Sequence, residues 1–404
     1  MSNRLRYVVV ALSCMLVFYI VIGGVLGLGS ASNEETYRDL GVYSEVLSRI
    51  KSDYVTQPNL QNVTGGAIRG LLEALDPYST YFTPEQYKDY LAHPEPGPAT
   101  VGLFVSKKFG FATIVAVLPG SPADKAGVVP SDLVDRVNGQ PVRELSAFQI
   151  QRELAGQPGT QVDVWIVNEE SQGQPQKMTL SRVVLSDPPV LSQMESNDTG
   201  YVRVENFDRG EAEKVATKVN RLVAEGARSL VLDLRDCAGG EPDEAVKTAS
   251  LFIQNGLIAY TYGQRDPRHN FDAVPMGAAF KMPLAVLINR STAGPAEIVA
   301  SAVLEDKRGD VVGVRSFGVG VVQKAIPIGD GSGLLLSVAE YYGPDGKAIQ
   351  DNGVDPNIVV PSPGEMALTG GPVVPLKDFG TPKDIQLQKA IQVLQQETPR
   401  SRVA

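Results

Sequence analysis

The chain has 404 residues, a formal net charge of −9 and a hydrophobic content of 43%, values typical of a globular protein of about two to three domains. The acidic balance argues against nucleic acid or anionic lipid as the main partner. The only cysteines, Cys14 and Cys237, are too few for a disulfide framework or a cysteine zinc site. We therefore expect neither a metal nor a cofactor.

An apolar run from Tyr7 to Leu28 opens the chain and follows Arg4 and Arg6. At about 22 residues it is long enough to span a bilayer, and the positive charge before it favours a cytoplasmic N-terminus. We expect a single-pass membrane anchor over residues 7–28, a cytoplasmic tail over residues 1–6, and the bulk of the chain on the extracytoplasmic (periplasmic) side. The alternative is a cleaved signal peptide, because small residues follow the run.

Residues 34–93 are predicted to form a helical region. Apolar residues recur at helical spacing from Leu40 to Tyr54 and again from Ile68 to Leu75. The segment Thr83–Gln86 has the form of a capped helix start with proline in its first turn. A stretch rich in proline and glycine, residues 94–100, then marks a linker.

The next predicted domain covers residues 94–184. It contains the turn and strand Val101–Val105, the turn and short helix Gly120–Gly127, and a capped helix that begins at Ser146 with Gln149 as its partner. Together these segments resemble a PDZ domain.

The resemblance implies that this domain binds the C-terminal tails of proteins. In such domains a peptide adds a strand to a sheet edge, and turn N–H groups hold its terminal carboxylate. We predict Val101, Gly102, Leu103 and Phe104 as the peptide-binding residues, because Gly102 permits close backbone approach and the next two side chains would flank the pocket. The alternative is that Leu103 and Phe104 are only strand core.

Residues 185–365 are predicted to form an α/β core, because apolar strand-like runs alternate with helical stretches. The runs are 201–204, 230–234, 284–288 and 334–336. Residues 366–404 are predicted to be a tail with one short helix, Ile385–Gln396.

Three segments of this core, residues 232–240, 289–298 and 316–323, resemble the active-site motifs of the carboxy-terminal processing peptidases. These are serine peptidases with a Ser/Lys dyad, and the resemblance covers about residues 36–360. It implies an α/β (α+β) peptidase core with an inserted PDZ-like β-sandwich or barrel domain.

The residues that perform the chemistry of that family are replaced here. The nucleophile slot is Gly294 and the base slot is Val319, 25 positions apart as the family pattern requires, while Gln323 keeps the place of the glutamine that orients the base. Glycine has no hydroxyl and valine accepts no proton. Pro295 follows the nucleophile slot and lacks the N–H that the family uses as an oxyanion donor.

Other residues near these slots retain part of the machinery. Gly239 and Gly240 match the turn that supplies the second oxyanion donor, so half of the oxyanion hole is predicted to persist. Cys237 has no evident base and is interpreted as a small buried residue rather than a nucleophile. Ser291 is the best spare nucleophile. The two histidines, in stretches predicted to be loops, pair with no serine motif.

We therefore predict a membrane-anchored, catalytically degenerate family member that binds protein C-terminal tails and regulates proteolysis, with an active relative or as a homodimer. The alternative is an active serine endopeptidase that recognises substrate C-termini and uses a displaced nucleophile. A weaker alternative is a structural tether that binds no peptide.

Overall fold

The computed structural model describes residues 38, 40–108, 111–168, 171, 173–186, 189–196, 198–277, 279–361 and 379–397. The anchor predicted at residues 7–28 lies outside this set. Within the described ranges, no helix combines the length and the apolar character needed to cross a membrane. The chain divides into two compact units, Met1–Ile68 and Arg69–Ala404.

The helices predicted for the N-terminal region are confirmed. Residues 40–53 are helical, and α2 (Leu60–Glu73) and α3 (Pro84–Ala92) follow. The predicted cap at α3 is also confirmed, because the Thr83 hydroxyl accepts the Gln86 N–H and the Gln86 side chain accepts the Thr83 N–H. Leu72 is the buried residue of α2, whereas Leu71 is exposed.

The PDZ region of the second unit is a small antiparallel sheet with one covering helix. Its core contains Val101, Leu103 and the alternating residues of one strand, Val162, Val164 and Ile166. The strand order is β3-β4-β5-β8-β9, with β6 paired to β5, and β2 pairs separately with β7. The elements are β2 (Ala99–Thr100), β3 (Leu103–Lys108), β4 (Phe111–Val117), α4 (Pro122–Lys125), β5 (Leu133–Val137), β6 (Gln140–Pro141), η1 (Val142–Glu144), α5 (Ala147–Leu154), β7 (Ala155–Gly156), β8 (Gln161–Val167) and β9 (Gln176–Ser181).

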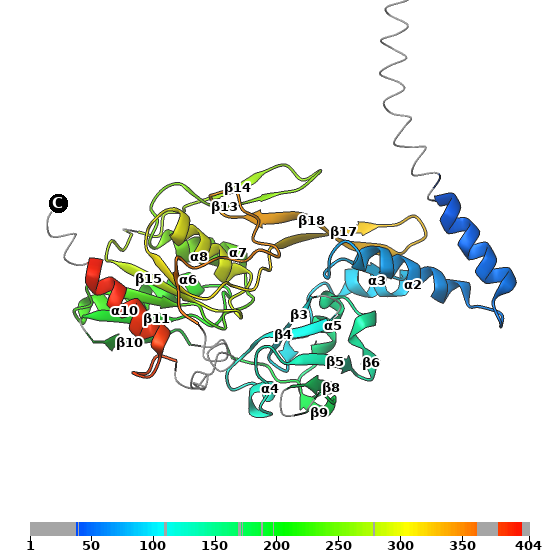
Figure 1. Ribbon diagram of the computed structural model, residues 1–404, viewed down its shortest axis with the longest axis horizontal. Coiled ribbons are helices and arrows are strands. Elements are labelled where there is room, and N and C mark those ends of the chain that lie inside the picture. The colour runs from blue at the N-terminus through cyan, green and yellow to red at the C-terminus, as the bar shows by residue number, and fades with distance from the viewer. Residues whose placement is uncertain are drawn as a thin grey trace, which may run out of the picture. The chain divides into compact units, whose positions relative to one another are not determined.

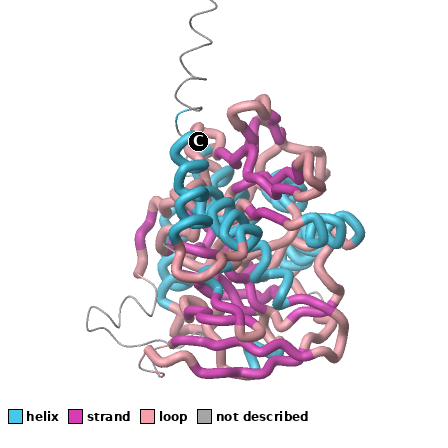
Figure 2. The backbone as a smooth tube through the Cα atoms, turned by 90° about the vertical axis from the view of Figure 1, so that its right-hand side faces the viewer, coloured by secondary structure: helices cyan, strands magenta, loops and turns pink. Residues whose placement is uncertain are grey.

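The peptidase-like core is built on a six-stranded, mostly parallel sheet of order β10-β11-β12-β15-β16-β19, in which β10 pairs antiparallel. Strands β11, β12 and β15 are buried along their whole length, as expected for parallel strands covered on both faces. The strands are β10 (Leu191–Glu195), β11 (Thr199–Arg203), β12 (Ser229–Asp233), β15 (Leu284–Ile288), β16 (Asp310–Gly313) and β19 (Ile358–Val359). Figure 2 shows strands in magenta and helices in cyan.

Helices pack on both faces of this sheet (Figure 1). Alternate strand residues divide between two apolar clusters: Leu230 and Leu232 face a cluster with α6 (Glu211–Ala224), α7 (Pro242–Ser250) and α8 (Pro295–Glu305), whereas Val231 faces α10 (Ile385–Glu397). The predicted C-terminal helix is thus confirmed as α10.

A second, antiparallel sheet has the order β1-β18-β13-β14, with β17 also paired to β18. Its strands are β1 (Thr80–Phe82), β13 (Leu257–Tyr262), β14 (His269–Asp272), β17 (Val321–Pro327) and β18 (Gly333–Tyr342). The prediction that His269 lies in a loop was wrong, because it begins β14. His93, by contrast, follows α3 as its C-cap.

A buried arginine connects α10 to the turn that follows β12. The Arg235 guanidinium donates to Asp384 at 2.6 and 2.9 Å and to Asp233 at 2.6 and 2.9 Å, and it lies 3.9 Å from the centre of the Phe379 ring. Burial works against ionisation, but the two arginines Arg235 and Arg203 hold the pKa of the Asp233 carboxyl below its usual value. This network fixes one end of the turn that carries Gly239.

Candidate degenerate active site

Three segments that are far apart in the sequence are hydrogen-bonded to one another at the carboxyl ends of β12, β15 and β16. The Ala293 N–H donates to the Cys237 carbonyl at 2.9 Å, and the Phe317 N–H donates to the Thr292 carbonyl at 2.9 Å. The turn after β12, the start of α8 and the segment after β16 therefore meet at one place. These segments are the three that carry the predicted slots.

Glu297, in the first turn of α8, holds the two principal slots together. One oxygen of its carboxylate accepts the N–H groups of Gly294 and Val319, both at 2.8 Å. The other accepts the Gly318 N–H at 2.7 Å and the Ser316 hydroxyl at 2.5 Å. Because a single oxygen accepts both backbone amides, Gly294 and Val319 are neighbours in the fold, as the family resemblance implies for the nucleophile and base slots.

The Glu297 carboxyl is fully buried. Burial raises its pKa to about 7, and the four hydrogen bonds oppose part of that rise. This role of Glu297 was not predicted from the sequence. A glutamate beside the apolar run Ile298–Ala300 was the available signal, since a buried acid needs hydrogen-bonding partners.

The backbone at the nucleophile slot is unusual. Gly294 precedes α8 with φ 61° and ψ −121°, a region that L residues with a side chain rarely adopt. A Cβ at this position would meet no atom within 4 Å. There is therefore room for a side chain at position 294, but the chain supplies none, and Pro295 brings no N–H to the adjacent position.

The space around the slots is filled by apolar side chains. Val319 packs in a cluster that joins residues of the turn, of the α8 start and of the PDZ strands. At the predicted base slot, Val319 therefore contacts apolar side chains, and no hydroxyl group is supplied at the predicted nucleophile slot, Gly294. The members are Phe104, Val115, Ala116, Ala238, Ala293, Phe317 and Val319.

The predicted oxyanion turn has its two glycines in backbone conformations that favour glycine, with φ 89° at Gly239 and 99° at Gly240. A Cβ added at Gly239 would lie 2.2 Å from the Phe104 ring, and one at Gly240 would lie 2.3 Å from the backbone of Phe207. The side chain predicted to flank the peptide pocket, Phe104, therefore packs against Gly239, one of the two glycines predicted to retain an oxyanion donor, whereas Gly240 is exposed.

Gln323, which keeps its family position, has a new partner. Its Nε2 donates to the Tyr78 carbonyl at 3.0 Å. The Tyr78 hydroxyl in turn lies 2.9 Å from the Ser106 hydroxyl on β3, and burial raises the pKa of Tyr78 to about 12. The glutamine thus serves as a structural contact between β17 and the segment before β1.

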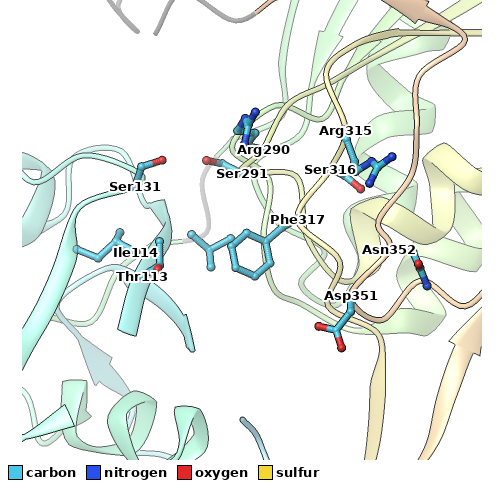
Figure 3. Close-up of a pocket in the computed structure, with 11 residues that line it drawn as sticks. Thr113, Ile114, Ser131, Arg290, Ser291, Arg315, Ser316, Phe317, Asp351 and Asn352 are labelled. Atoms are coloured by element: carbon cyan, nitrogen blue, oxygen red, sulfur yellow. The ribbon is translucent and has the colours of Figure 1, made fainter. Parts of the chain in front are cut away.

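Ser291, the predicted spare nucleophile, is buried and borders a cavity of about 500 Å³. Figure 3 shows the Phe317 ring, which lines this cavity, pointing toward the side where Thr113 and Ile114 of β4 lie. Among the described residues, none is hydrogen-bonded to the Ser291 hydroxyl, whereas its N–H donates to Asn289 Oδ1 at 3.0 Å. The arrangement places no base on this serine.

Cys237 is fully buried in the core of the sheet, as its sequence interpretation predicts. Burial raises the pKa of its thiol well above the usual value, so the nucleophilic thiolate is disfavoured at neutral pH.

The four residues predicted to bind peptide lie at the start of the PDZ sheet. Val101 and Leu103 are buried in its core, with exposed fractions of 0% and 1%. Gly102 adopts φ 84°, and a Cβ there would lie 2.2 Å from the Ser121 side chain. Phe104 points out of this core into the cluster around Val319.

Together these features define a serine-peptidase type of α/β core that carries a PDZ domain. Comparisons with known proteins agree. Residues 198–360 match the model of peptidase family S41, and residues 113–167 match a PDZ domain model.

Several bacterial proteases are similar over most of their length. The carboxy-terminal-processing protease of Bartonella bacilliformis is 30% identical over 340 residues, which cover 83% of this chain and 78% of that protein. The carboxy-terminal processing protease CtpA of Bacillus subtilis is 30% identical over 350 residues, 86% of this chain and 74% of that protein. The solved structure of a photosystem II D1 C-terminal processing protease has a TM-score of 0.65 and 25% identity, covering 79% of this chain and 92% of that one. The chain therefore belongs to the carboxy-terminal processing peptidases of family S41.

Proposed function

We propose that this protein binds the C-terminal tails of other proteins through its PDZ domain and does not hydrolyse them. The observation that carries the proposal is the arrangement around Glu297. Its carboxylate holds the backbone of Gly294 and Val319 side by side, yet neither residue has a group that attacks a carbonyl or accepts a proton. The frame of the family's active site is retained while its reactive groups are absent.

The chemistry supports this reading independently at each position. Efficient hydrolysis of a peptide bond requires an activated nucleophile, its base and an oxyanion hole acting together. Removing one oxyanion donor alone typically reduces the rate about 100- to 1000-fold, and Pro295 removes one. The Phe104 ring packs against Gly239, where the other donor is predicted. The missing nucleophile, the missing base and the loss of an oxyanion donor all act against hydrolysis at the same place.

A digestion assay tests the proposal. The full-length protein is incubated with an unfolded protein substrate, beside an active relative and a Ser291→Ala variant. We expect fragments only with the active relative. Turnover by the wild-type chain that survives repeated purification and disappears in Ser291→Ala would overturn the proposal.

The second candidate function is an active serine endopeptidase that recognises substrate C-termini and uses Ser291. The cavity beside this serine is the observation that favours it. Against it, its hydroxyl has no hydrogen-bonded base among the described residues, and a serine hydroxyl is a poor nucleophile without one. The same assay separates the two candidates.

We infer that the protein shields the tails it binds or regulates an active relative by associating with it. The alternative partner is a second copy of this chain. The relatives above are named for processing carboxyl termini, which supports protein tails as the ligand class. Light scattering of the purified chain, alone and mixed with an active relative, distinguishes a monomer, a homodimer and a mixed complex. A monomer in both samples would contradict the partnership.

We also propose that residues 7–28 anchor the chain in a membrane with its bulk on the extracytoplasmic side. The length of the apolar run and the preceding arginines support this. We expect the protein to remain in the membrane during alkaline extraction. We also expect protease added outside the cytoplasmic membrane to digest it. Release into the soluble fraction, or an N-terminus that begins after residue 28, would contradict it.

A further inference from the structure

The proposed peptide-binding side of the PDZ domain is the edge of β3. Among the described strands, β3 has one strand neighbour, β4, and α5 lies along its other side. In an extended strand, the carbonyl of one residue and the N–H of the residue two positions on point to the same side. On the side facing α5 these groups are the Leu103 carbonyl and the Val105 N–H.

One side chain occupies both groups. The Gln151 amide, on α5, donates from Nε2 to the Leu103 carbonyl at 2.9 Å, and its Oε1 accepts the Val105 N–H at 3.2 Å. A carboxamide carries one acceptor and one donor side in a fixed plane. Gln151 thus offers β3 the same pair of hydrogen bonds that a backbone unit of an added strand would offer.

The helix that carries Gln151 is held firmly in place. Ser146 and Gln149 form the capping box at its start, the Ser146 hydroxyl lies 2.6 Å from the Thr80 hydroxyl, and the Ala147 N–H donates to the Pro77 carbonyl at 3.0 Å. Opening the edge therefore requires the Gln151 side chain to turn away, because its helix is anchored outside the PDZ domain.

The turn before β3 is also satisfied internally. The Gly102 N–H, one of the groups expected to face a terminal carboxylate, donates to the Thr100 hydroxyl at 3.2 Å. Donors on both the strand edge and the preceding turn are thus already engaged by the protein's own side chains.

We propose that Gln151 is a removable cap on the PDZ groove, which a protein tail must displace in order to pair with β3. This inference rests on the proposed binding of tails and adds how that binding is controlled. The occupant of the open groove is the extended C-terminal segment of a protein with a free carboxylate, because the edge accepts backbone hydrogen bonds. Gln151 is partly exposed, so its amide can be rehydrated when displaced.

The cap is tested with Gln151→Met, which keeps the length of the side chain and removes both hydrogen bonds. The matched control is Gln140→Met, at an exposed glutamine of the same domain. The probe is a set of fluorescein-labelled decapeptides ending in a free Ala, Val, Leu or Phe, with their C-terminal amides as controls. Fluorescence anisotropy gives Kd for the full-length proteins.

Two net hydrogen bonds correspond to about a tenfold effect on Kd or somewhat more. We expect Gln151→Met to bind free-carboxylate peptides about tenfold more tightly than the wild type, with Gln140→Met unchanged. Faster hydrogen exchange at the Val105 amide should accompany the gain. Should Gln151→Met not fold, Gln151→Glu is the second test, because a carboxylate repels the Leu103 carbonyl and is expected to loosen the cap similarly.

The other outcomes overturn the inference in distinguishable ways. Equal affinity of wild type and Gln151→Met would leave tail binding standing and refute the cap. Weaker binding by the variant would mean that Gln151 contacts the ligand directly. Absence of binding by every variant, with free and amidated peptides alike, would refute the proposed binding of tails and the cap with it.

Discussion

The slot region of the peptidase core and the edge of the PDZ domain are both occupied by the protein's own side chains, but in different ways. In the core, Phe104 covers Gly239 and Val319 packs in an apolar cluster. At the PDZ edge, one amide makes two hydrogen bonds, both to groups that a ligand would use.

The difference shows that a site covered by the protein's own side chains can still contain every group it needs. A site can also be covered while its reacting groups are replaced. Rotating Gln151 away would leave a complete sheet edge, with its donors and acceptors ready for a peptide. Moving Phe104 away would expose Gly239 more fully but would not supply the hydroxyl missing at position 294 or the amine missing at position 319. Under the proposed function, the PDZ site is closed and intact, whereas the core site lacks its reacting groups.

The largest expected effect concerns the frame that the core retains. Replacing Glu297 by alanine leaves four donors without their acceptor, and each unsatisfied buried group typically costs about 1–3 kcal/mol. We expect Glu297→Ala to lower the free energy of unfolding by about 4 kcal/mol or more. Urea unfolding measures it, with the exposed Glu213→Ala as control. A loss no greater than that of the control would mean that the carboxylate does not hold the segments together.

The next prediction restores the missing groups. A Gly294→Ser and Val319→Lys double variant returns a hydroxyl and an amine but leaves Pro295 without an N–H. We expect its turnover to remain at least about 100-fold below that of an active relative. Adding Pro295→Ala should raise the rate, as measured by peptide cleavage followed by mass spectrometry. Full activity in the double variant would show that the proline matters little.

The third prediction concerns pH. The pKa of Glu297 is raised from its ordinary value of 4.5 to about 7 in the folded protein, so the folded state binds the extra proton between these values. Stability from this group is present in full below about pH 4.5 and is lost as the pH rises to about 7, by at most about 3 kcal/mol. Denaturant unfolding from pH 5 to 7.5 should show this fall in the wild type. A Glu297→Gln variant with the same slope would contradict it.

The smallest effect is expected at Phe104. Truncation to alanine uncovers Gly239 and removes partly buried apolar contacts, which should lower the free energy of unfolding by about 2 kcal/mol. Hydrolysis should stay absent, because uncovering the turn supplies no nucleophile. Thermal unfolding measures the change in stability, and the digestion assay measures hydrolysis. Turnover in Phe104→Ala would mean that the aromatic ring, rather than the missing groups, blocks catalysis.

Local parts of the fold were predictable from the sequence because the interacting residues are close in the chain. The capping boxes at Thr83 and Ser146 join residues three positions apart. The proximity of Gly294 and Val319 was also predictable, because a family resemblance fixes which distant segments meet.

The contacts on which the proposed function rests were not predictable, because each joins segments that only the tertiary fold brings together. Gln151 lies nearly fifty residues from its partners on β3, and nothing near it in the sequence distinguishes it from a surface glutamine. Phe104 was predicted to flank a peptide pocket, yet it points from the PDZ domain toward Gly239. The Arg235–Asp384 pair likewise joins a turn to the C-terminal helix.

The most direct test of the central claim follows binding and cleavage in one sample. A labelled peptide with a free carboxylate is mixed with the full-length wild type or with Gln151→Met, anisotropy reports the complex, and mass spectrometry of the same sample reports the peptide. The account predicts saturable binding, tighter for the variant, and a peptide of unchanged mass after prolonged incubation. Fragments that accumulate in proportion to the bound complex would contradict it.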